Sequence, residues 1–250
     1  MRTDLKTIAL EDEVSRADSE PATGRQRTPV RKRQGRPKAD KSQAATYRRI
    51  LSVATKEFSA RGFDGARVDE IVRRSKVSKN LVYHYFDSKE RLFIAVLESA
   101  YENMHANTAW PSDFSSATDG IRQFIRAIFK YWNDAPEFIG LLNSENFHKG
   151  RHLKKTKMVR AGYSNLFATI KRLLDEGHKR GHFRGGVDPV ELYISISSLC
   201  YHFFSNRYTL SILLGRDLSS EKQMNLRLKE IEDMVLGYLQ CGAAAEPKSR

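Results

Sequence analysis

Cysteine is scarce in this sequence, and no long apolar run occurs in it. Of the 250 residues only two are cysteines, Cys200 and Cys241. This excludes a disulfide scaffold and a cysteine-rich zinc site, and it is typical of proteins of the reducing cytoplasm. No apolar segment approaches the ~20 residues that a bilayer-spanning helix needs, and residues 1–19 lack the apolar centre of a secretory signal. We therefore expect a cytoplasmic protein without a membrane segment.

Acidic side chains are in deficit. The 43 Lys and Arg residues outnumber the 30 Asp and Glu residues, which gives a formal net charge of +13. Such an excess points to a polyanionic partner, with nucleic acid first and an anionic membrane surface second. The charge is unevenly placed, because residues 21–49 hold ten basic side chains and a single acidic one, Asp40. At 40% hydrophobic residues the chain can still bury a core.

Strand signals are also missing, and helical periodicity dominates from Gln43 onward. This pattern predicts an all-α protein. The expected helices are 43–61, 67–74, 79–86, 89–107, 116–133, 136–148, 151–181 with Gly162 as a candidate break, 189–207, 208–214 and 220–240. The predicted domains are a disordered tail and basic arm (1–41), a helix-turn-helix DNA-binding domain of three helices (42–88), a helical ligand-binding and dimerisation domain (89–241) and a disordered tail (242–250).

The segment 67–86 has the dimensions of a helix-turn-helix, in which the second helix is free to enter a groove of DNA. On a helical wheel one face of 79–86 carries Lys79, Asn80, Tyr83 and His84, and the other carries Leu81, Val82, Tyr85 and Phe86. A cation, an amide and an aromatic edge suit the edges of bases. An ordinary solvated helix face would look similar, but the adjacent basic segment favours DNA.

A basic arm precedes these helices. The sequence Gly35-Arg36-Pro37-Lys38 can place Arg36 in a narrow minor groove on an extended backbone. On composition alone a generic basic tail is the better explanation. Its position directly before a candidate helix-turn-helix favours the minor-groove arm.

One motif runs through the first three predicted helices into the fourth. It comprises Ile50, Leu51, Ala54, Phe58, Gly62, Phe63, Gly65, Val68, Ile71, Val77, Ser78, Lys79, Val82, Tyr83, His84, Tyr85, Phe86, Ser88, Lys89, Glu90 and Leu92. In order and spacing this stretch resembles the tetracycline-repressor (TetR) family of bacterial transcriptional regulators. A basic Gly-Arg-Pro arm ahead of the motif is common in that family. The match is far more specific than a bare helix-turn-helix pattern.

The resemblance implies a homodimer whose recognition helices, 79–86, enter the major grooves of a palindromic operator. It also implies that Tyr85 and Lys89 touch phosphates, and the wheel predicts that the Tyr85 ring is half buried. The fourth helix, as in the family, would link the two domains. Taken together, the expected DNA contacts are Arg36, Lys38, Arg67, Ser78, Lys79, Asn80, Tyr83, His84, Tyr85 and Lys89.

The sequence departs from the family pattern at two places. Ala66 stands where Thr or Ser usually caps the second helix, which removes a cap worth roughly 1 kcal/mol. Ser75-Lys76 replaces the usual Ala-Gly of the turn, so Lys76 is expected to adopt a positive φ.

The C-terminal half is expected to bind a small molecule and to dimerise. Helices 189–207 and 220–240 would form a four-helix bundle across a two-fold axis. Its candidate apolar positions are Ile194, Leu199, Ile231, Val235 and Leu239, which could equally be monomer core. The segment 188–218 resembles a subgroup that includes regulators of catabolic genes for aromatic and nitrogen-heterocyclic compounds. The resemblance therefore suggests an aromatic or heterocyclic effector.

Rings and a few polar groups provide candidates for the effector site. They are Trp132, Phe138, Asn143, Phe147, Tyr163, Tyr201, His202 and Asn206, with Glu145 and His148 nearby in the sequence. For any one of them a role in the core is the plainer interpretation. The spacing of Glu145 and His148 is only a weak metal signal, so neither a metal site nor a cofactor is predicted.

Catalytic motifs are not found: the sequence has no phosphate-binding loop, nucleophile elbow or informative Cys-His pair, so no enzyme is predicted. The favoured hypothesis is a ligand-responsive, dimeric DNA-binding repressor that a small molecule releases from its operator. The alternative is a constitutive architectural protein that binds DNA with low specificity. Two further alternatives, an all-α enzyme and a membrane-surface protein, leave the helix-turn-helix face unexplained. The operator, the effector and the sign of regulation stay open.

Deletion of residues 1–41 tests the minor-groove arm. The deletion should lower DNA affinity, most strongly for sites flanked by A·T pairs, because a narrow minor groove attracts arginine. Fluorescence anisotropy on sites with A·T or G·C flanks measures the difference. An affinity that the deletion leaves unchanged on both sites would remove the arm from the interface.

Overall fold

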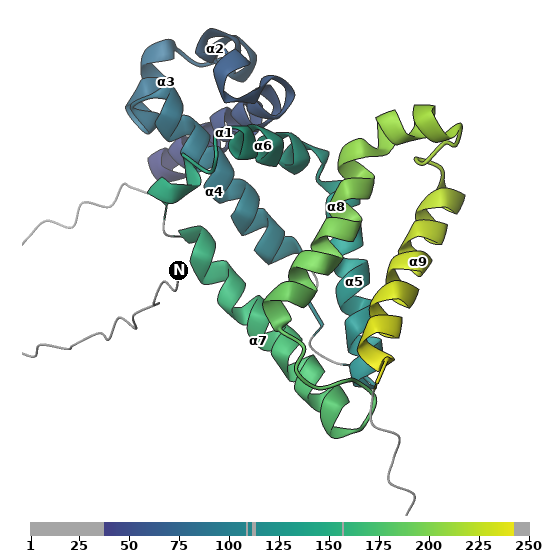
Figure 1. The fold of residues 1–250 in the computed structure, drawn as a ribbon. Coiled ribbons are helices and arrows are strands. Elements are labelled where there is room, and N and C mark those ends of the chain that lie inside the picture. The colour runs from purple at the N-terminus through teal and green to yellow at the C-terminus, as the bar shows by residue number, and fades with distance from the viewer. Residues whose placement is uncertain (1–37, 109, 112–113, 157, 243–250) are drawn as a thin grey trace, which may run out of the picture.

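The computed structural model describes residues 38–108, 110–111, 114–156 and 158–242, so residues 1–37 and 243–250 of the predicted tails, Arg36 among them, lie outside these ranges. Within them the chain is helical and contains no strand, which confirms the all-α prediction. The helices are α1 (Lys38–Gly65), α2 (Val68–Ser75), α3 (Lys79–Phe86), α4 (Lys89–Asn107), α5 (Ala117–Asp134), α6 (Pro136–Phe147), the 3₁₀ helix η1 (Leu153–Lys155), α7 (Met158–Lys179), α8 (Pro189–Leu214) and α9 (Glu221–Gln240) (Figure 1).

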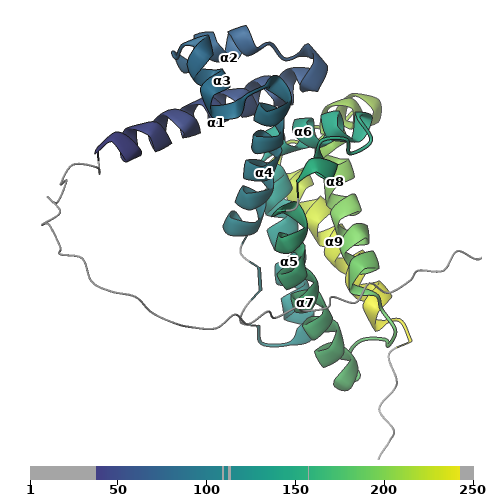
Figure 2. The same ribbon diagram turned by 90° about the vertical axis from the view of Figure 1, so that its left-hand side faces the viewer.

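The helices form two groups that α4 connects. Figure 2 shows α1, α2 and α3 at one end of the molecule and the bundle of α5, α7, α8 and α9 at the other. The first turns of α4 contribute Leu92 and Phe93 to the core of the first group. Its later turns contribute Tyr101 and Met104 to the core of the second. One helix therefore belongs to both cores, as the family resemblance implied.

The first helix is longer than predicted. It begins at Lys38 rather than at Gln43, because the segment after Pro37 is rich in Lys, Ala and Gln, which favour helix. The predicted stop at Gly62 is a kink: φ is 67° and ψ is 178° at this residue, and one further turn follows it. Only a glycine adopts this conformation without strain.

Two predictions about the second half are wrong. The stretch 151–181 is not one helix, because Leu153–Lys155 form the 3₁₀ helix η1 and Thr156 is extended (φ −113°, ψ 142°) before α7 begins at Met158. The α7 helix continues unbroken through Gly162. The predicted helices 189–207 and 208–214 are a single helix, α8, which ends at Gly215 in the left-handed conformation. No residue between them breaks the helical hydrogen-bond ladder.

The apolar stripe of α9 faces the monomer core. Ile231, Val235 and Leu239 are buried, so these predicted interface positions pack inside the protomer. Of the predicted α8 positions, Leu199 is partly buried and Ile194 is 49% exposed. Besides Ile194, further apolar side chains lie at the surface of the two helices: Val190, Leu226, Met234 and Tyr238, and at the C-terminal end of α8 Tyr208, Ile212, Leu213 and Leu214.

Helix α6 packs against α1 and joins the two groups of helices (Figure 1). The Ser144 hydroxyl oxygen accepts a hydrogen bond from the Phe63 backbone N–H at 2.9 Å. Gly140 lies so close to α1 that a β-carbon would come within 2.4 Å of the Ser59 carbonyl oxygen. The turn after α6 is held by Glu145, whose buried carboxylate accepts from the backbone N–H of His152 at 2.7 Å.

His148 adds two contacts where α6 meets α1. Its Nδ1 lies 2.7 Å from the Ser144 carbonyl oxygen and its Nε2 lies 3.0 Å from a carboxylate oxygen of Asp64. Because both ring nitrogens face acceptors, the imidazolium form satisfies both contacts. The Ser144 carbonyl, and after it the Asp64 carboxylate, raise the pKa of His148 above its ordinary 6.5.

The stabilising effect of His148 should therefore depend on pH. Since its folded-state pKa is raised, the contribution is complete below pH 6.5 and is lost as the pH rises through the folded-state pKa. Urea unfolding across this range should show that wild type has a higher free energy of unfolding than His148→Gln, and that this difference decreases as the pH rises. His202→Gln, at an exposed histidine of α8, is the control. A difference that does not vary with pH would contradict the assignment of an imidazolium.

Candidate nucleic-acid interface

The turn between α2 and α3 has the geometry that the sequence predicted. Lys76 ends α2 in the left-handed conformation, with φ 54° and ψ 45°. Ser78 begins α3, and its hydroxyl accepts a hydrogen bond from the Leu81 backbone N–H at 3.2 Å. Both the positive φ and the Ser78 cap are therefore confirmed.

A carboxylate that the sequence analysis did not single out supports the start of α2. Ala66 is buried, and the N-cap residue Arg67 makes no side-chain cap. Instead, the carboxylate of Glu57 on α1 accepts from the Arg67 backbone N–H at 3.3 Å. The same buried carboxylate pairs with Arg61 at 3.3 Å and with Arg74 at 3.5 Å. Glu57 of α1 thus holds the residue that precedes α2, although it does not accept from the first-turn N–H groups that a Thr or Ser cap would satisfy.

The predicted recognition face of α3 is exposed. Lys79, Asn80, Tyr83 and His84 all lie at the surface, and the opposite face is anchored by buried side chains, including Val82. Tyr83 is 37% exposed, so its ring edge can reach a base while its body rests on the helix. This burial pattern is the one that the helical wheel predicted.

Lys79 has an internal partner. Its ammonium lies 2.8 Å from a carboxylate oxygen of Asp69 on α2, and both side chains are mostly exposed. The hydrogen bond from Lys79 to Asp69 raises the pKa of the lysine, which keeps it cationic. Exposed pairs of this kind are weak, so a base or phosphate can displace Asp69.

Tyr85 and Lys89 lie beside this face. The Tyr85 ring is half buried, as predicted, and its hydroxyl donates to the Gln43 carbonyl oxygen at 3.4 Å. The Lys89 ammonium donates to the Asp64 carbonyl oxygen at 3.2 Å and lies 5.0 Å from the centre of the Phe63 ring. Their contacts with phosphate stay predictions. The Arg67 side chain is exposed, whereas Lys38 is the first residue of α1 and its side chain lies outside the description.

The predicted effector residues do not form one site. Trp132 stacks on Phe138 at 5.7 Å and contacts Tyr201 at 5.0 Å, and the Tyr201 hydroxyl donates to Asn143. These four residues lie together.

The other four candidates lie elsewhere. Tyr163 packs against Tyr193 at 5.8 Å. Asn206 donates to the carbonyl oxygen of His202, an exposed residue, at 3.0 Å, and Phe147 is 81% exposed.

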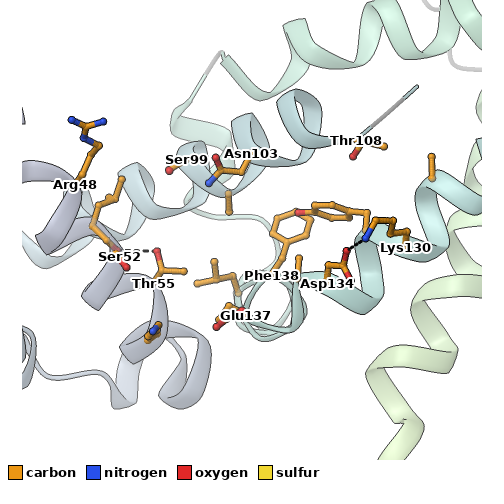
Figure 3. A pocket seen from close by; sticks show the side chains of 17 residues that line it. Arg48, Ser52, Thr55, Ser99, Asn103, Thr108, Lys130, Asp134, Glu137 and Phe138 are labelled. Atoms are coloured by element: carbon orange, nitrogen blue, oxygen red, sulfur yellow. Dashed lines mark hydrogen bonds and ion pairs between the residues drawn. The ribbon is translucent and has the colours of Figure 1, made fainter. Parts of the chain in front are cut away.

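A cavity of about 760 Å³ lies between the two groups of helices. It is bounded by α1 from Arg48 to Lys56, α4 from Ser99 to Asn103, α5 from Ala127 to Asp134 with Ala135 after it, and α6 from Glu137 to Leu141. Figure 3 shows Phe138 between the side chains of α1 and the Lys130–Asp134 ion pair. Of the predicted effector residues only Phe138 lines it. No local pattern could indicate this cavity, since its walls are far apart in the sequence.

Other chemistry is not evident in the parts of the chain that the structure describes. No three His, Cys, Asp or Glu side chains are grouped there to hold a metal ion. The described helices include none that is long and apolar enough to cross a membrane. Burial raises the pKa of the Cys200 thiol to about 12, so this cysteine is not a thiolate at neutral pH.

Known protein families match both groups of helices. Residues 50–96 match the family model of bacterial regulatory proteins of the tetR family, and residues 118–235 match the tetracyclin repressor-like C-terminal domain. The HTH-type transcriptional repressor NicS of Pseudomonas putida is 35% identical over 188 residues, which cover 75% of this chain and 89% of NicS. The HTH-type transcriptional regulator RutR of Escherichia coli K12 is 26% identical over 206 residues, which cover 80% of this chain and 92% of RutR.

Solved structures show the same fold. The crystal structure of the transcriptional regulator SCO4942 from Streptomyces coelicolor superposes with a TM-score of 0.59 at 21% identity, over 78% of this chain and 98% of that one. The exposed α3 face, the helix-turn-helix that holds it and these matches lead to one conclusion. The chain belongs to the TetR family and is a DNA-binding transcription regulator, not an enzyme.

Proposed function

We propose that this protein is a repressor that binds a palindromic operator as a homodimer and leaves it when a small molecule binds. It would act on the bacterial chromosome in the cytoplasm. The observation that carries the sequence-specific part is the α3 face, where Lys79, Asn80 and Tyr83 are exposed together on a helix that is anchored from behind. These groups read base edges in a major groove, and phosphate contacts alone would not need them.

The surface of α8 and α9 supports the homodimer. Ile194, Met234 and Tyr238 are between 45% and 50% exposed, and Met234 and Tyr238 line one groove between α8 and α9. Apolar side chains that are grouped at a surface mark interaction sites. A two-fold axis at this face would form a bundle of four helices. It would also present two α3 helices to major grooves about 34 Å apart.

Met234→Glu tests the dimer. Because Met234 is 45% exposed in the protomer, the charge should leave the fold intact but separate the two copies. Sedimentation equilibrium should give a dimer mass for wild type and a monomer mass for the variant. Ala168→Glu, at an exposed position of α7, should remain a dimer. A dimer mass for Met234→Glu would exclude this face as the interface.

The cavity between the domains supports the ligand response, because a molecule in it would touch both α1 and the C-terminal helices. A relative from Streptomyces griseus, 32% identical over 148 residues and 58% of this chain, is named the A-factor receptor protein. An effector can change DNA affinity only as far as it prefers one conformation over the other. For the effector to release the DNA, the effector-bound conformation must place the two α3 helices at a separation that does not match the two major grooves.

Fluorescence anisotropy tests the proposal as a whole. The protein is titrated onto DNA from upstream of its own gene and onto shuffled DNA of equal composition, at two salt concentrations. A preference of about 10³-fold or more that persists at the higher salt supports a specific regulator. Selection of bound fragments from the whole genome then covers operators elsewhere. Binding without preference in both experiments would favour the architectural alternative.

Tyr83→Ala tests the role of α3. The variant should weaken binding to the operator by about 1–3 kcal/mol and relax the choice of base at one position. Lys89→Ala is the comparison, because loss of a phosphate contact should weaken all sequences similarly and flatten the salt dependence. Anisotropy on a set of single-base operator variants separates the two effects. If both variants behave alike, the division into base and phosphate contacts is wrong.

A further inference from the structure

The cavity between α1 and the C-terminal helices has the size and lining of a small-molecule site. Its volume of about 760 Å³ lies within the range of roughly 300–1,000 Å³ that such sites occupy. Leu51, Ala100, Tyr131, Phe138 and Leu141 give it apolar walls. Hydroxyl groups and one amide, that of Asn103, interrupt these walls. A largely apolar cavity with a few polar groups accepts a ligand that has an apolar body and a polar end.

Rings form one wall of the cavity. Phe138 lines it directly and is fixed from behind by Trp132, which stacks on it at 5.7 Å, and by Tyr101, which meets it edge-on at 5.0 Å. Tyr131 lines the cavity beside Phe138, with ring centres 5.6 Å apart. A wall of fixed aromatic rings favours a flat apolar body, because rings stack with little loss of conformational freedom.

The charges at the cavity leave a positive excess. Lys130 pairs with Asp134, so these two groups neutralise each other. Glu137 lies in the first turn of α6, where the helix dipole already favours an anion. Lys56 on α1 lines the cavity and makes no ion pair with any residue that the structure describes. Arg48 lies two turns earlier on α1, and its Nε donates to the Ala44 carbonyl oxygen at 3.3 Å, so its guanidinium points away from Phe138 (Figure 3). The side that belongs to the DNA-binding domain can therefore take an anionic group.

We infer that this cavity is the effector site, and that it takes a small organic anion with a flat apolar body. The anionic group would lie toward Lys56 on α1, and the body would lie against Tyr131 and Phe138. The inference rests on the proposed ligand response, and it names where the effector binds and what kind of molecule it is.

Helix α6 provides the path from this site to the DNA-binding domain. Its first turns supply Phe138 and Leu141 to the cavity. Its later part holds the DNA-binding domain through the hydrogen bond between Ser144 and Phe63. Between them, Gly140 leaves no room for a side chain against Ser59 of α1. A ligand that displaces the first turns of α6 therefore displaces α1 with it, together with α2 and α3, relative to α4.

Direct binding of a probe pair tests the site without DNA. The probes are 2-naphthoate and its neutral isostere 2-naphthamide, titrated into the full-length protein by isothermal titration calorimetry. Naphthoate should bind about tenfold or more tightly than the amide, because a charge-assisted contact favours the anion. Lys56→Met should remove this preference by weakening the carboxylate alone, whereas Lys171→Met, at an exposed lysine of α7, should not.

A blocking variant tests the location. Ser52 is exposed on α1 at the cavity, so Ser52→Trp should keep the fold and lower the affinity for naphthoate by about tenfold or more. Ser164→Trp, at an exposed position of α7, is the matched control. Thermal unfolding by circular dichroism verifies the fold of each variant. If Ser52→Trp does not fold, the Lys56→Met result decides in its place.

Several outcomes would overturn the inference. Naphthoate that does not bind at its solubility limit, or that binds no better than the amide, contradicts the anionic class. Binding that neither Ser52→Trp nor Lys56→Met alters places the probe elsewhere. Naphthoate that binds in the cavity but leaves operator affinity unchanged removes the link to DNA. Failure to find any operator contradicts the proposed function instead, since the calorimetry does not involve DNA.

Discussion

The contact between the backbones of α6 and α1 at Gly140 constrains how the two domains of this protein meet. A β-carbon there would lie 2.4 Å from the carbonyl oxygen and 2.5 Å from the hydroxyl oxygen of Ser59. Because no side chain separates the helices at this point, the contact cannot be adjusted by a change of rotamer. The hydrogen bond between Ser144 and Phe63 fixes the same pair of helices one turn later. A movement of α6 is therefore passed to α1 and is not absorbed between them.

The orientation of the recognition helix α3 depends on this contact between α6 and α1. Val82 and Phe86 attach α3 to the core that α1 and the first turns of α4 also share. Leu141 of α6 belongs to the same core, so the DNA-binding domain is packed directly against the helix that lines the cavity. Side chains in such a core interdigitate at the density of a crystal and move as a unit. DNA recognition and the cavity are thus connected by packed contacts over a short distance.

Local patterns in the sequence were enough to predict the recognition face and the fold class. The division of α3 into an exposed and a buried side, the positive φ of Lys76 and the Ser78 cap all depend on neighbouring residues. Contacts between distant segments were not accessible in this way. The role of Glu57 depends on where α2 begins relative to α1, and the cavity depends on four helices. The stripe of Ile231, Val235 and Leu239 has the same period whether it faces a partner or the protomer's own core, which is why the sequence left both roles open and only the structure shows these residues buried in the protomer.

Asp69 gives the recognition face an acceptor of its own before any DNA arrives. Its carboxylate holds Lys79 at 2.8 Å and is itself 77% exposed on the surface that would approach the duplex. In a complex with DNA this negative charge would be repelled by the phosphates of every sequence alike. A site that offers Lys79 the O6 and N7 of a guanine compensates part of that repulsion, and a site without these acceptors compensates less of it. An acidic residue in a basic interface would in this way increase the difference in affinity between the operator and other genomic DNA. It would lower the affinity for both.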